Sequence, residues 1–359
     1  MKKILLVMFI FIYAVTGHTQ TASIKGIVFG DYFYNLKNHS AINEDENGFL
    51  LRRIYFTFEN QLTDNIKMRF RLDTKHEDYG EKEKLYPFVK HAYLEIKNII
   101  PHHKFYLGIS ATNAIDNTQS YWGYRPIEKT IMNLNKISDS ADMGLSLKGD
   151  INQYIHHWIT VFNGTGYGSS EVDKYKKLGY SLWITPIEGM ILEGYIDYEK
   201  QDPETGTYAP AADYFHSSGY RTLKGFAGYR NSNFTLGGVI FSRVNYKSGS
   251  SDSEGTKKCD VTKTGISVFG NMTIVASKLK AFARYDYFDP NTDDHVYIDP
   301  AMNGKDDEET LVLAGLDLTV ANTLHLMPNI IIKGYRNNNI DQDITARITF
   351  SYKYDTGSF

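Results

Sequence analysis

The sequence predicts an all-β protein, a transmembrane antiparallel β-barrel of about 16 strands, and three observations carry this prediction. Apolar and polar residues alternate in short segments along nearly the whole chain. Long and short polar connections alternate between these segments. The composition, with 27 Tyr, 20 Phe and 29 Gly, is typical of strands that are joined by flexible turns.

A targeting segment is expected at residues 1–20. Lys2 and Lys3 precede an apolar stretch that begins at Ile4, and small and polar residues follow this stretch. The stretch is too short to cross a bilayer as a helix, which takes about 20 apolar residues. We therefore expect a cleaved signal peptide, with residues 21–359 forming the barrel. No later run is apolar and long enough for a membrane helix, which argues against a helical membrane protein.

Period-2 alternation is clearest in the segment from Ile66 to Asp73. One face carries Met68, Phe70 and Leu72, and the other carries Lys67, Arg69, Arg71 and Asp73. The same pattern predicts strands at approximately 24–35, 49–61, 65–74, 88–97, 103–112, 141–150, 153–163, 175–185, 189–200, 218–230, 232–246, 261–274, 277–288, 310–320, 323–336 and 343–354. A polar face in nearly every strand favours a barrel with a water-filled interior.

The lengths of the connections alternate as they do in outer-membrane barrels, which have short periplasmic turns and long extracellular loops. Long connections are expected at 37–48, 75–87, 113–140, 164–174, 201–217, 247–260 and 289–309. The connections between them are short, as at 63–64, 186–187 and 231, and the last one, 337–342, is also short. An even number of strands places both ends of the barrel on the periplasmic side.

The inward faces of the predicted strands carry more bases than acids, although the whole chain has a formal net charge of -3. The bases that we expect to form a cation ladder in the lumen are Arg53, Lys67, Arg69, Arg71, Lys104 and Lys148. Excess positive charge inside a low-dielectric wall attracts anions. The alternative is that these bases pair with lumen carboxylates and leave a polar interior without ion preference.

Several signals exclude other kinds of site. The negative net charge argues against a nucleic-acid partner, and a single cysteine excludes a disulfide framework or a cysteine-based metal centre. His102-His103 and His156-His157 are adjacent pairs, and neighbours in a strand point to opposite faces and cannot chelate one metal together. We therefore expect no metal and no cofactor.

An enzymatic alternative rests on His216 and Ser218, which share a strand face. An outer-membrane phospholipase uses this arrangement for its base and nucleophile, but no orienting partner can be identified from spacing. This alternative, a barrel that supports a lipid-acting enzyme or a surface adhesin, stays open beside the expectation that the protein is not an enzyme.

The chain resembles the phosphate-selective porin O and P family of Gram-negative outer membranes, in the form found in Bacteroidetes-type bacteria. The resemblance covers most of the chain after residue 20 and rests on four segments, Gly30–Tyr34, Gly48–Tyr55, Trp122–Arg125 and Ser140–Gly144. It implies a 16-stranded barrel, usually a homotrimer, whose lumen guides anions. The implied partners are outer-membrane lipid, lipopolysaccharide and small anionic or polar solutes.

The connection at about 113–140 is rich in aromatic residues and has Pro126 at a plausible helix start. In porins, the long loop after the fifth strand folds inward and narrows the channel. The residues that we expect at this constriction are Tyr121, Trp122, Tyr124, Arg125, Glu128 and Lys129. The alternative is a cap that packs over the rim of the barrel.

Overall fold

The structure is a computed structural model that describes residues 21–79, 82–171, 174–201, 217–250, 258–293, 297–299, 302–303, 308–337 and 339–358. The expected signal peptide, residues 1–20, lies outside the described residues. No helix in these described ranges is long and apolar enough to cross a membrane.

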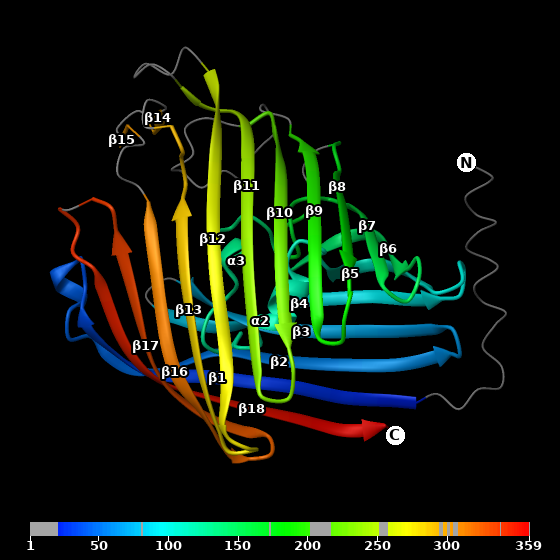
Figure 1. Cartoon of the computed structure of the whole chain (residues 1–359), viewed down its shortest axis with the longest axis horizontal. Coiled ribbons are helices and arrows are strands. Elements are labelled where there is room, and N and C mark those ends of the chain that lie inside the picture. The colour runs from blue at the N-terminus through cyan, green and yellow to red at the C-terminus, as the bar shows by residue number, and fades with distance from the viewer. Residues whose placement is uncertain are drawn as a thin grey trace.

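One antiparallel sheet contains every strand (Figure 1). The strands are β1 (Thr21–Lys37), β2 (Asn47–Thr63), β3 (Ile66–Tyr79), β4 (Lys82–Lys97), β5 (His103–Ala111), β6 (Ala141–Asp150), β7 (Ile155–Phe162), β8 (Lys177–Ile184), β9 (Met190–Lys200), β10 (Gly219–Arg230), β11 (Phe234–Ser250), β12 (Lys258–Val275), β13 (Leu279–Asp289), β14 (Tyr297–Asp299), β15 (Met302–Asn303), β16 (Glu309–Ala321), β17 (Leu324–Tyr335) and β18 (Asp343–Ser358). The helices are η1 (Ala41–Asn43), α2 (Asp116–Trp122) and α3 (Ile131–Leu134).

The sheet closes on itself between its first and last strands. β1 pairs with β18 along most of its length, with Val28 opposite Tyr352. β14 and β15 are short strands in the connection between β13 and β16, so the barrel wall consists of the other 16 strands. This closed 16-stranded antiparallel barrel confirms the predicted fold class, and closure leaves no unpaired strand edge.

The two faces of the wall have opposite chemistry, and β8 shows this most simply. Its residues alternate along the strand, with Lys177 and Ser181 buried in the interior and Leu178 and Leu182 exposed on the outside. Exposed apolar side chains on the outer face suit contact with lipid, and polar side chains on the inner face suit water or a packed polar interior.

Two of the expected long loops are shorter than the sequence suggests. β3 continues to Tyr79 and β4 begins at Lys82, so most of the expected loop at 75–87 is a hairpin. Likewise, β11 continues to Ser250 and β12 begins at Lys258, which shortens the expected loop at 247–260. The ladder hydrogen bonds of a hairpin do not require an apolar face, so the strands continue past the point where apolar alternation ends.

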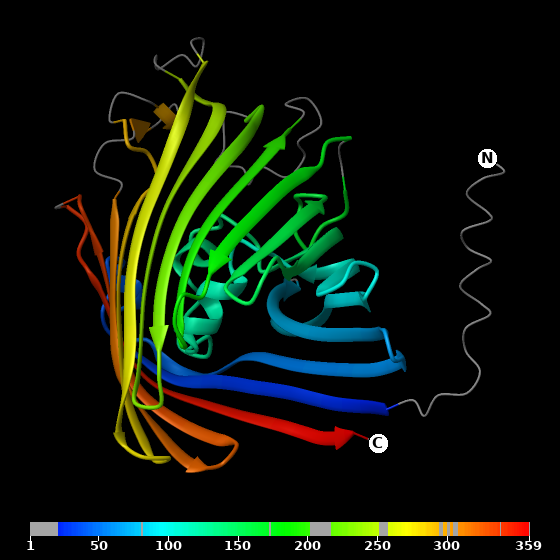
Figure 2. The same cartoon turned by 45° about the vertical axis from the view of Figure 1, so that its right-hand side comes forward.

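The connection between β5 and β6 carries α2 and α3, and Figure 2 shows both helices on the concave side of the sheet. Trp122 is 1% exposed and packs edge-on against Phe269 of β12, at 5.6 Å between ring centroids. Phe282 of β13 stacks on Tyr124 at 4.4 Å. At Gly237 a Cβ atom would lie 2.4 Å from the Phe269 ring, so this position needs glycine. Aromatic contacts of this kind hold the connection against the inner wall.

Candidate functional site

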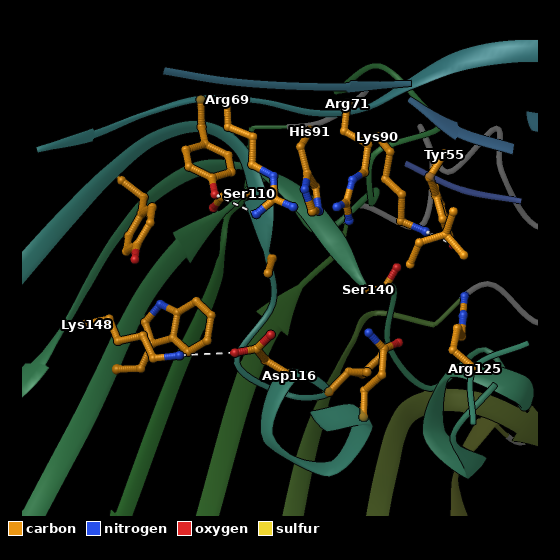
Figure 3. Close-up of a pocket in the computed structure, with 17 residues that line it drawn as sticks. Tyr55, Arg69, Arg71, Lys90, His91, Ser110, Asp116, Arg125, Ser140 and Lys148 are labelled. Carbon is orange, nitrogen blue, oxygen red and sulfur yellow. Dashed lines mark hydrogen bonds and ion pairs between the residues drawn. The ribbon is translucent and has the colours of Figure 1, made fainter. Parts of the chain in front are cut away.

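A hollow of about 380 Å³ lies between the inner wall and the start and end of the β5–β6 connection. Its charged and titratable lining residues are Arg69, Arg71, Lys90, His91, Asp116, Arg125 and Lys148. Its aromatic lining residues are Tyr55, Tyr93, Tyr106 and Trp158. Figure 3 shows Arg69, Arg71 and His91 on one side of the hollow, with Asp116 and Arg125 on the side of the connection. The hollow therefore combines a strong excess of positive charge with aromatic surface.

Three of the bases in the hollow are paired with carboxylates. Lys90 Nζ lies 3.0 Å from an oxygen of Asp73, and Lys148 Nζ lies 3.1 Å from an oxygen of Asp116. The guanidinium Nε of Arg69 lies 3.5 Å from Glu59. These pairs compensate much of the positive charge and fix the positions of the side chains.

Arg71 and Arg125 differ, because neither has a carboxylate partner among the described residues. Arg71 Nε donates a hydrogen bond to Thr57 Oγ1 at 2.7 Å, and its guanidinium lies 5.3 Å from the centre of the Tyr55 ring. Arg125 Nη1 donates to the side-chain oxygen of Asn133 at 2.7 Å. No carboxylate of the described residues therefore offsets the charge of either guanidinium, and both groups retain donors for an anion.

Several buried polar atoms around the hollow have no partner among the described protein atoms. They include the hydroxyls of Ser110 and Ser140, the indole nitrogen of Trp158 and Nδ1 of His91. Buried polar groups normally have hydrogen-bond partners, so these atoms are available to water or to a polar solute in the hollow.

Two bases that strand parity did not place in the lumen are Arg52 and Lys90. A β-bulge in β2 leaves Arg52 outside the pairing with β1, and a second bulge in β4 does the same for Lys90 beside β3. A bulge puts two consecutive side chains on one face, which strict alternation cannot anticipate. Arg52 Nη2 donates to Asp31 at 3.0 Å, and its Nη1 donates to the carbonyl of Ile127 in the β5–β6 connection.

The remaining predicted ladder residues do not line the hollow. Arg53 forms an ion pair with Asp73, and Lys67 lies 2.9 Å from Glu59. Lys104 is exposed near the short turns and lies 3.6 Å from Glu95. The predicted ladder residues that line the hollow are therefore Arg69, Arg71 and Lys148.

Two of the expected constriction residues are buried in the packed core and do not face an open passage. Trp122 donates its indole N–H to the carbonyl of Glu128 at 2.9 Å. Tyr124 is 7% exposed, and its hydroxyl donates to Asp317 at 3.2 Å. The side chains of this pair thus pack against the wall and do not line the hollow, because burial of aromatic surface is favourable. That they narrow the lumen stays a prediction.

The other constriction candidates are less buried. Tyr121 donates its hydroxyl to the carbonyl of Gly189 at 3.0 Å, and Arg125 lines the hollow. Glu128 borders a second hollow of about 320 Å³ beside β16–β18. Burial lowers the pKa of the Lys129 ammonium below its ordinary value, and the positive charge of Arg53 lowers it further.

The described residues do not show a catalytic site around His216 and Ser218, on which the enzymatic alternative rests. His216 lies outside the described residues. Ser218, just before β10, donates its hydroxyl to the backbone carbonyl of Tyr246 in β11 at 3.3 Å. No group of three or more His, Cys, Asp or Glu residues that could hold a metal occurs in the described ranges.

Comparison with known proteins places this fold among outer-membrane channels. No protein-family model and no curated protein matches the chain. The outer-membrane channel DcaP of Acinetobacter baumannii is similar, with a TM-score of 0.68, 12% identity, and coverage of 94% of this chain and 98% of that chain. An anion-selective porin from Comamonas acidovorans is similar with a TM-score of 0.63 and 10% identity, and the match covers 94% of this chain and 100% of that chain. The trimer form of OmpT of Vibrio cholerae has a TM-score of 0.61 and 12% identity, and the match covers 94% of this chain and 100% of that chain. The chain thus has the barrel fold of outer-membrane porins.

Proposed function

We propose that this chain is a porin of a Gram-negative outer membrane, which admits small hydrophilic solutes by passive diffusion and prefers anions. The observation that carries the proposal is the pair Arg71 and Arg125, which line the hollow without a carboxylate partner in the described part of the chain. A low-dielectric wall strengthens the attraction between such cations and a passing anion.

Phosphate-like anions are the solutes that the family resemblance favours. The guanidinium groups of Arg69, Arg71 and Arg125 are suited to bind phosphate or carboxylate oxygens in a bidentate way. The aromatic walls at Tyr55 and Trp158 add contact area for the organic part of a larger anion. A homotrimer is the assembly we propose, supported by the trimer form of the similar OmpT barrel.

Conductance of the folded protein in a planar bilayer tests this function. We expect discrete open steps, and we expect a salt gradient to give a reversal potential displaced toward that of chloride. Added phosphate should reduce the chloride current because it occupies the same cations. Protein that is shown to be folded and gives no steps would contradict the channel, and steps without ion preference would contradict the anion preference.

A further inference from the structure

Two histidines meet on the outer face of the barrel, near the short turns. Alternation separates the members of each adjacent pair, as expected, but the fold brings one member of each pair together. Nε2 of His103 in β5 lies 2.8 Å from Nε2 of His157 in β7. The centroids of the two rings are 5.0 Å apart, and the ring planes are nearly perpendicular, at 77°. The meeting therefore occurs across strands and not along one strand.

The strand between them, β6, is shaped to allow this contact. Gly149 pairs with His103 on one side and with His157 on the other. A Cβ atom at Gly149 would lie 2.3 Å from the His103 ring, so any other residue would displace that imidazole. The absence of a side chain at this position leaves space in which the two imidazoles meet above the strand.

The hydrogen bond that Nδ1 of His103 makes determines which ring nitrogen carries the proton. Nδ1 of His103 lies 2.7 Å from the carbonyl oxygen of Pro101, and a carbonyl can only accept, so Nδ1 is the donor. In the neutral ring, Nε2 then presents a lone pair toward His157. A histidine ligand of a metal commonly donates its second ring N–H to a backbone carbonyl in this way, which orients the ring and increases its basicity.

We propose that His103 and His157 bind a divalent transition-metal ion of the copper type through their Nε2 atoms. Two nitrogen ligands at about 2.0 Å from a metal, at right angles, lie about 2.8 Å apart. This separation matches the 2.8 Å between the two Nε2 atoms and suits the square-planar geometry that Cu²⁺ and Ni²⁺ prefer. Water completes the coordination, and a proton on Nε2 of His157 moves to Nδ1 of the same ring when the metal binds.

The site is separate from the hollow in the lumen. Along β7, Trp158 is buried and lines the hollow, whereas His157 precedes it and points to the opposite face. His156 faces inward and lies 2.6 Å from Asp150 through Nδ1. Metal binding at His103 and His157 therefore does not depend on the proposed anion pathway.

Titration of the folded, full-length mature protein with Cu²⁺ in detergent tests the site, with calorimetry for stoichiometry and electron paramagnetic resonance for the ligands. We expect one tight site per chain, with the signature of two imidazole nitrogens. His103→Gln and His157→Gln should each weaken binding by about tenfold or more. Gly149→Val should weaken binding while both histidines remain.

The neighbouring histidines provide matched controls. His102→Gln and His156→Gln remove one imidazole each, from the same turns, and should leave the tight site unchanged. Resistance of the unheated protein to unfolding on a gel shows that each variant is folded. Equal binding by wild type, His103→Gln and His157→Gln, or a wild-type spectrum without two imidazole nitrogens, would overturn the proposal and leave only a hydrogen bond between the rings.

Discussion

At the scale of single residues, Arg71 and Arg125 differ from the other bases of the hollow, because no carboxylate of the described residues pairs with either guanidinium. The other bases of the hollow balance a carboxylate within 3.5 Å, as Lys148 does with Asp116. In the described part of the chain, the Thr57 hydroxyl and the Tyr55 ring hold the Arg71 guanidinium and orient it without offsetting its charge. Under the proposed function, such a site would attract anions without holding them tightly, as passage requires.

Lys129 gives a prediction about pH. An ammonium carries its charge below its pKa and loses it as the pH rises through that value. Because burial lowers the pKa of Lys129, its charge is lost at a lower pH than that of an ordinary lysine, whose pKa is about 10.4. We expect the chloride-to-potassium permeability ratio to fall as the pH rises toward the ordinary lysine pKa, before an ordinary lysine would lose its charge. Reversal potentials at each pH measure this ratio.

The matched variant for this prediction is Lys129→Arg. Arginine stays charged through the whole range, so the variant should keep its permeability ratio at alkaline pH where the wild type loses part of it. An equal decline in both proteins would show that other groups cause the pH dependence.

The β5–β6 connection is the element that shapes the interior, and Trp122 is its main anchor. Trp122→Ala removes contacts with Phe269 and Phe282, and truncation of a buried tryptophan costs about 3–5 kcal/mol. We expect a lower free energy of unfolding in urea, together with larger and noisier open steps, because the connection is released from the wall. Tyr154→Ala serves as the control, since Tyr154 is 52% exposed in a short turn. Unchanged steps in Trp122→Ala would mean that the connection does not limit the conductance.

At the scale of elements, apolar–polar alternation predicts which segments are strands and which side chains face inward, because successive residues of a strand point to opposite faces of the sheet. It predicts the 16 wall strands and the inward positions of Lys67, Arg69 and Arg71. It misses Arg52 and Lys90, because the two bulges shift the parity locally. A bulge depends on the register with neighbouring strands, which the order of residues in one strand does not reveal.

The packing of the connection is also beyond what alternation can show. Phe269 and Phe282 lie on inner faces, where the pattern alone predicts polar residues facing water. Their contacts with Trp122 and Tyr124 join segments that are far apart in the sequence. Only the closed barrel shows that these aromatic residues form one core with the connection.

At the scale of the whole molecule, the barrel combines a closed wall, an apolar outer face and an interior divided by the β5–β6 connection. Positive charge gathers on the wall at β3 and β4, opposite the aromatic core that anchors the connection to β10–β13. A solute that crosses the lumen on this side passes Arg71 and Arg125, which would determine the ion preference of the whole pore.

The most direct test of this claim is the reversal potential of Arg71→Gln/Arg125→Gln in a salt gradient, measured beside the wild type and Lys104→Gln. Lys104 is exposed and lies 3.6 Å from Glu95, so its removal takes away one charge outside the hollow. We expect the wild type and Lys104→Gln to prefer chloride equally, and the double variant to conduct with its permeability ratio shifted strongly toward one. Retention of the wild-type chloride preference by the folded double variant would contradict the role proposed for Arg71 and Arg125.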